Sequence, residues 1–164
     1  MQNSILKFNK TIDLINISKY KRHKNGFGLY SLAHTTSFKA KELQSLVSDD
    51  CSWESAIQEY PNFHPSKFDL IWKNMVIQGL YYGLSKIEHY EPLEIVLKDI
   101  EGHIMHSNNY SMFAVGILAA FTELKVKIDE EDLEGLYDFV GSSKGKDLDA
   151  IPDLDELVFK TYRI

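Results

Sequence analysis

The chain has 164 residues, and 18 Lys and Arg side chains against 24 Asp and Glu give a formal net charge of −6. Hydrophobic residues make up 44% and charged residues 26%, which is typical of a packed globular protein and excludes a disordered or fibrous chain. A single cysteine excludes an intrachain disulfide framework, and the acidic balance argues against a nucleic-acid binder.

Apolar residues recur mostly at steps of three and four, which predicts a mainly α-helical chain. In chain order, helices are predicted over about 4–20, 37–47, 53–60, 65–84, 92–104, 110–124 and 129–140. Asn25-Gly26 is interpreted as a turn, and the last segment, 152–164, is compatible with a helix or a short strand.

Short links between consecutive helices favour antiparallel neighbours. We therefore expect a single helical domain over residues 1–164, built as an antiparallel helical bundle or a short helical array. Gly79 and Gly83 lie four residues apart, which would allow another helix to pack closely there. The longest apolar run covers only residues 112–121, about half of what a membrane-spanning helix needs. We expect a cytoplasmic protein that does not contact membranes.

Charge is distributed unevenly along the chain. Residues 1–48 carry a net +6, residues 49–128 a net −5 and residues 129–164 a net −7. The spacing places Glu131, Glu134 and Asp138 on one helical face, where like charges repel because the cluster holds no cation. Such a face is either a solvated surface or a site for a cationic partner.

The predicted partner-binding residues combine this face with a neighbouring tyrosine and with acids further along the chain, because tyrosine is enriched at protein interfaces. They are Glu130, Glu131, Glu134, Tyr137, Asp138, Asp147, Asp149 and Asp153.

Motifs for nucleophilic catalysis and for phosphate binding are absent from the sequence, so no enzyme activity and no cofactor are expected. Cys51 follows Asp50, and a neighbouring carboxylate raises a thiol pKa, which indicates an inert cysteine. A metal site is a weaker alternative. On the helix predicted over 92–104, Asp99, His103 and His106 would project from one face, and two imidazoles with a carboxylate can bind a divalent metal.

A small acidic chain without catalytic motifs, with carboxylates at 129–132 and at Glu134 and Asp138, resembles the immunity proteins of bacterial contact-dependent growth inhibition systems. The resemblance implies tight binding to a cognate toxin, often a nuclease with a cationic substrate groove. The inhibitor would cover that groove and exclude RNA or DNA without chemistry of its own. It would not bind nucleic acid directly, and its basic first third would face away from the toxin.

Two other functions remain open. An adaptor could bind a peptide in a groove between helices, at the face of Gly79 and Gly83 or at exposed tyrosines. A helical metalloenzyme would use Asp99, His103 and His106. The sequence does not decide the oligomeric state or the identity of a partner.

Overall fold

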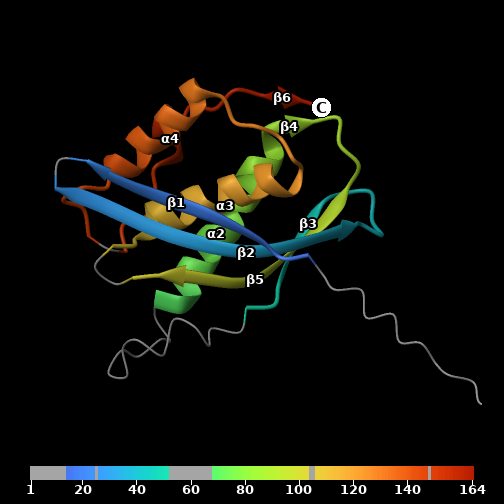
Figure 1. Ribbon diagram of the computed structural model, residues 1–164, viewed down its shortest axis with the longest axis horizontal. Helices are drawn as coiled ribbons and strands as arrows, with labels where there is room; N and C mark the ends of the chain where they lie inside the picture. The colour runs from blue at the N-terminus through green and yellow to red at the C-terminus, as the bar shows by residue number, and fades with distance from the viewer. Residues whose placement is uncertain (1–13, 25, 52–67, 104–105, 148) are drawn as a thin grey trace, which may run out of the picture.

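A computed structural model describes residues 14–24, 26–51, 68–103, 106–147 and 149–164 of the chain. Strands and helices are both well represented among them (Figure 1). The strands are β1 (Asn16–Lys24), β2 (Phe27–Lys39), β3 (Leu46–Asp49), β4 (Ile87–Glu88), β5 (Leu93–Gly102) and β6 (Tyr162–Arg163). The helices are α2 (Phe68–Ser85), α3 (Asn109–Glu123), α4 (Glu130–Gly141) and the short 3₁₀ helix η1 (Leu154–Glu156).

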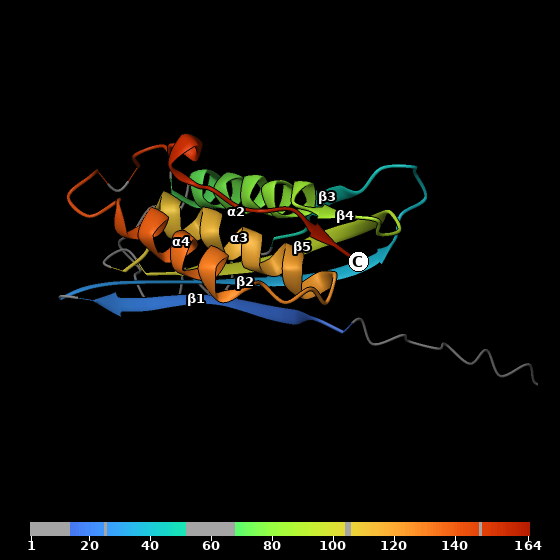
Figure 2. The same ribbon diagram turned by 90° about the horizontal axis from the view of Figure 1, so that it is seen from above.

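The main sheet has the strand order β1-β2-β5-β3. The pairs β1–β2 and β2–β5 are antiparallel, whereas β3 runs parallel to β5. The helices α2, α3 and α4 lie on one side of this sheet (Figure 2). A second, two-stranded sheet joins β4 to β6 and fixes the C-terminal segment to the end of α2.

The prediction of a mainly helical bundle is therefore wrong, because the protein is a mixed α/β domain with a sheet under its helices. The helices predicted over 65–84, 110–124 and 129–140 correspond to α2, α3 and α4. The segment predicted as a helix over 92–104 holds β5, and the one predicted over 37–47 spans the end of β2 and the start of β3.

Two predicted helices fall wholly or partly outside the described residues. Of the helix predicted over 4–20, the described residues 16–20 belong to β1. The helix predicted over 53–60 lies outside the described residues. The last segment contains both η1 and the short strand β6, which lies at Tyr162–Arg163, near the C-terminal end of the segment.

The core lies between the sheet and the helices α2 and α3. α3 is buried nearly all round, with its N-terminus fixed by a capping box between Asn108 and Ser111. α2 crosses α3 at glycines: an added Cβ at Gly79 would lie 2.1 Å from the carbonyl oxygen of Phe113. The close helix packing predicted from Gly79 and Gly83 is confirmed, and it leaves no groove at Gly79 for a peptide.

The inward face of the hairpin β1–β2 carries several polar side chains, and these form hydrogen bonds with side chains of α3. Ser31 donates to Ser111 over 2.8 Å, at the start of α3. At the other end of the helix, the Glu123 carboxylate accepts hydrogen bonds from Thr35 at 2.5 Å and Ser37 at 2.6 Å. These contacts join the sheet to α3 and keep the hairpin in place beneath α4.

Candidate functional site

Helix α4 carries most of the predicted partner-binding residues on its exposed side. Asp129 caps the helix by accepting a hydrogen bond from the backbone N–H of Asp132 at 3.0 Å. The carboxylates of α4 that face solvent fall within an arc of about 100° around the helix axis, because a helix turns once in about 3.6 residues. These are Glu130, Glu131, Glu134 and Asp138.

The opposite side of α4 packs on the core through Leu136, Phe139 and Val140. Asp132 also lies on this side and is buried, where it accepts a hydrogen bond from the Tyr162 hydroxyl at 2.7 Å. Burial, followed by the hydrogen bond to Asp132 and the charge of that carboxylate, raises the pKa of Tyr162. The Tyr162 hydroxyl is therefore a stable donor that holds the C-terminal segment against α4.

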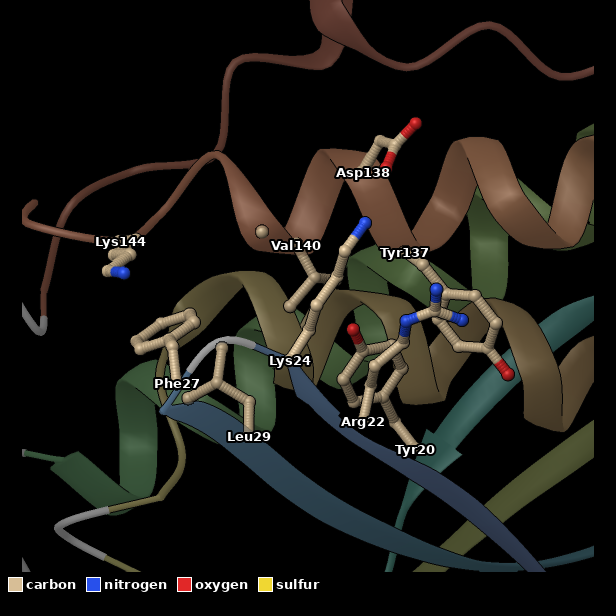
Figure 3. Close-up of a pocket in the computed structure, with 10 residues that line it drawn as sticks. Tyr20, Arg22, Lys24, Phe27, Leu29, Tyr137, Asp138, Val140 and Lys144 are labelled. Atoms are coloured by element: carbon tan, nitrogen blue, oxygen red, sulfur yellow. The ribbon is translucent and has the colours of Figure 1, made fainter.

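Glu134 has a cationic partner, contrary to the expectation of an acidic cluster without one. The two terminal nitrogens of Arg22, on β1, donate to the Glu134 carboxylate over 3.2 and 3.3 Å. The same guanidinium lies over the ring of Tyr137, with 4.1 Å between its central carbon and the ring centre (Figure 3). The basic first third of the chain thus contributes at least one side chain to this site and does not face away from it entirely.

The acids beyond α4 are exposed and lie in the segment that leads to η1. Asp147 and Asp149 are solvent-facing, and Asp153 caps η1 by accepting from the N–H of Asp155 at 3.1 Å. η1 returns to the end of α4, where Ser142 donates to Glu156 at 3.0 Å. The segment after α4 therefore returns to the C-terminal end of that helix.

We call the predicted set Glu130, Glu131, Glu134, Tyr137, Asp138, Asp147, Asp149 and Asp153 the acidic surface. Its tyrosine is half-buried between Arg22 and Tyr20, whose ring meets it edge-on at 5.9 Å. The carboxylates are accessible, so the surface can form ion pairs with a cationic partner. Two of them, Glu134 and Asp153, already accept hydrogen bonds within the protein.

A pocket of about 280 Å³ lies beside the acidic surface, between the tip of the β1–β2 hairpin and the last turns of α4. Figure 3 shows how strand and helix side chains meet around it. Tyr20, Leu29 and Val140 are buried and form its apolar base, and Phe27 is half-buried at its edge. The charged lining residues are Arg22, Lys24, Lys144 and Asp138.

Sequence reasoning missed the cationic half of this pocket. Residues 4–20 are predicted as a helix, so the prediction does not place the side chains that follow on one face of a strand. In a strand, alternate side chains share a face, so Tyr20, Arg22 and Lys24 all point toward α4 and away from Lys19 and Lys21. The Asn25-Gly26 turn flanked by this alternation was the available signal.

The alternative metal site does not assemble in this fold. Asp99 lies on β5 and His103 directly follows that strand, so the predicted helical spacing does not apply. The rings of His103 and His106 stack at 5.1 Å between their centres. Within the ranges that the structure describes, no three His, Cys, Asp or Glu side chains are placed to hold a metal ion.

Cys51 follows β3 and is partly buried. Burial raises the pKa of its thiol to about 12, and the charges of Asp49 and Asp99 add to that effect. The raised pKa predicted from the neighbouring carboxylate is confirmed, although burial is the larger cause. The thiolate, the reactive form of cysteine, is therefore scarce in the folded protein.

At pH 8 we expect iodoacetamide to alkylate Cys51 at least about a hundredfold more slowly in the folded chain than in urea, because the thiolate fraction is about a thousandfold smaller. Mass spectrometry at timed intervals would measure both rates, with glutathione in the same buffers as a control for the effect of urea. Equal rates in the two states would contradict the assignment of a buried, protonated thiol.

Fold and site together define a two-layer α/β domain with an exposed acidic helix and a mixed-charge pocket. No protein-family model and no curated protein matches the sequence. Among solved structures, the protein ttk003000868 from Thermus thermophilus aligns with a TM-score of 0.51 at 11% identity, over 79% of this chain and 20% of that one. This likeness shows a shared fold and nothing about activity.

The phosphomevalonate kinase of Streptococcus pneumoniae aligns with a TM-score of 0.32 at 12% identity, over 88% of this chain and 45% of that enzyme. The chain therefore spans less than half the length of either protein. In the part of the chain that is described, no helix has the length and hydropathy to cross a membrane.

Proposed function

We propose that this chain is a toxin inhibitor of the immunity type. It would bind a cognate antibacterial toxin, such as a nuclease with a cationic active site, and block that site with its acidic surface. The observation that supports this proposal is an excess of unpaired acid on α4 and in the segment that follows it. Seven exposed carboxylates there form no ion pair with any other described residue, namely Glu130, Glu131, Asp138, Asp147, Asp149, Asp153 and Asp155.

The physical argument is electrostatic. Unpaired carboxylates close together in the chain create a negative potential that attracts a basic protein from solution and accelerates association. Once bound, α4 and the segment after it would occupy the place of the nucleic acid phosphates. The inhibitor needs no catalytic group for this, so inhibition is steric and electrostatic.

The test takes the protein encoded by the neighbouring gene as the candidate toxin and measures its association rate with this chain by surface plasmon resonance at several salt concentrations. In the double variant Glu131→Lys/Asp138→Lys we expect association to slow by about tenfold or more at low salt, because two unpaired carboxylates become cations. The difference should shrink as salt rises, since ions screen exposed charges.

The matched control is Glu42→Lys/Glu91→Lys, which changes net charge by the same amount at exposed sites outside the acidic surface. We expect this control to slow association by less than about threefold. The proposal fails if both double variants associate equally fast, or if expression of the chain does not protect cells from the toxin.

A further inference from the structure

The pocket between the β1–β2 hairpin and α4 has the size of a small-ligand site. Its volume of about 280 Å³ lies just below the range of about 300–1,000 Å³ that is common for such sites. A small organic molecule fits within it. The pocket is formed by secondary-structure elements of the domain and needs no other chain to complete it.

The base and one edge of the pocket are apolar. Tyr20 and Leu29 come from the hairpin and Val140 from α4, and each is at most 6% exposed. Phe27 is half-buried at the edge, so its ring remains accessible to a ligand. Burial raises the pKa of the Tyr20 hydroxyl, and the nearby Tyr137 adds to that effect, so Tyr20 stays neutral. These side chains would surround a flat apolar ring.

The rim of the pocket carries more positive than negative charge. Lys24 and Lys144 line it from opposite sides, and Figure 3 shows Lys24 extending toward α4 and Lys144 lying beyond Phe27. Neither lysine forms an ion pair with another residue that the structure describes. Of the three cations that line the pocket, Arg22 pairs with Glu134, and the single charge of Asp138 offsets that of one lysine. The other lysine has no counterion among the lining residues.

We propose that this pocket binds a small organic acid in which one carboxylate is attached to a flat apolar ring. The ring would rest on Leu29 and Val140 beside Phe27, and the carboxylate would lie between the ammonium groups of Lys24 and Lys144. The single negative charge of the ligand would neutralise the one positive charge at the rim that has no counterion. The pocket shares Tyr137 and Asp138 with the acidic surface, but its test is independent of the proposed inhibition of a toxin, because binding of the acid requires only the isolated chain.

The experiment is a titration of the ¹⁵N-labelled chain with benzoate, followed by amide chemical shifts. We expect saturable shifts with a dissociation constant of the order of millimolar, as is usual for a ligand of this size. The shifts should concentrate at residues 20–29 and 137–144. Benzyl alcohol, which keeps the ring without the charge, and acetate, which keeps the charge without the ring, should each bind at least about tenfold more weakly.

The variant Lys24→Gln/Lys144→Gln should raise the dissociation constant for benzoate at least about fivefold, because it removes both cations. Lys125→Gln/Lys127→Gln, at exposed lysines between α3 and α4, is the matched control and should bind as the unchanged protein does. The amide spectra also report that each variant is folded. The proposal is overturned if benzyl alcohol binds as well as benzoate, if shifts scatter over the surface, or if the two variants bind equally.

Discussion

Replacing Gly116 with alanine is expected to destabilise the protein by about 3 kcal/mol, because α2 and α3 touch through their backbones there. A Cβ at Gly116 would lie 2.2 Å from the carbonyl oxygen of Val76 and 2.9 Å from the backbone nitrogen of Leu80. Backbone atoms cannot rotate away as a side chain would, so the two helices must move apart. The gain of up to about 1 kcal/mol from helix propensity does not offset this strain.

Urea unfolding followed by circular dichroism would measure the change as a lower midpoint at an unaltered slope. Gly135→Ala is the matched control, because it places the same methyl group inside α4, where the nearest atom is 3.9 Å away. We expect this control to stabilise the protein by about 0.5–1 kcal/mol. If both variants shifted the midpoint in the same direction, the close contact between α2 and α3 would be refuted.

The sequence was sufficient to predict the helical layer because its signals are local. Gly79 and Gly83 revealed the contact face of α2, and the continuous apolar character of α3 indicated its burial. Asp129 marked the start of α4 as an N-cap. Each of these signals comes from residues within one or two turns of each other, so no knowledge of the tertiary structure is needed.

β5 was mistaken for a helix because it contains a bulge. Leu93, Ile95 and Leu97 are buried on alternate positions, but Val96 between them is buried too, and the pairing with β2 shifts between His34 and Thr35 and leaves one residue of β5 unpaired. The next buried residue is therefore Ile100. The spacing 93, 97, 100 repeats at four and three residues, which is also the spacing of a helical face.

The hairpin was missed for a different reason, since its inward face lacks hydrophobic alternation. Ser18, Ser31 and Thr35 are buried there, and each finds a hydrogen-bond partner on α3. A pattern search counts such residues as polar and therefore as exposed. Their burial depends on partners about 80 to 100 residues further along the chain, which a local pattern cannot show.

Only the acidic half of the candidate site was predicted, because the partners of its cationic half are far away in the sequence. The carboxylates of α4 are clustered in sequence and were found. Arg22 pairs with Glu134 over a separation of 112 residues, and Lys24 and Lys144 meet only around the pocket. Once the hairpin is absent from the predicted fold, nothing brings Arg22 and Lys24 to α4.

Replacing Phe159 with alanine is expected to lower stability by about 3–5 kcal/mol, because this side chain holds the C-terminal segment over the helices. Phe159 is 5% exposed, and its ring centre lies 5.7 Å from that of Phe121 on α3 and 6.3 Å from that of Tyr82 on α2. Truncation leaves a cavity between the two helices. For a domain of this size the melting temperature should fall by roughly 10 °C.

The matched control is Val158→Ala, at the preceding residue, whose side chain is 83% exposed and should change stability by less than about 0.5 kcal/mol. Differential scanning calorimetry compares the two variants, and an equal melting temperature for both would show that the segment does not stabilise the core. The effect should extend to α4, because Tyr162 bonds to Asp132 and Lys160 pairs with Asp129. Hydrogen exchange in α4 should therefore accelerate in Phe159→Ala, which would loosen the helix that carries the acidic surface.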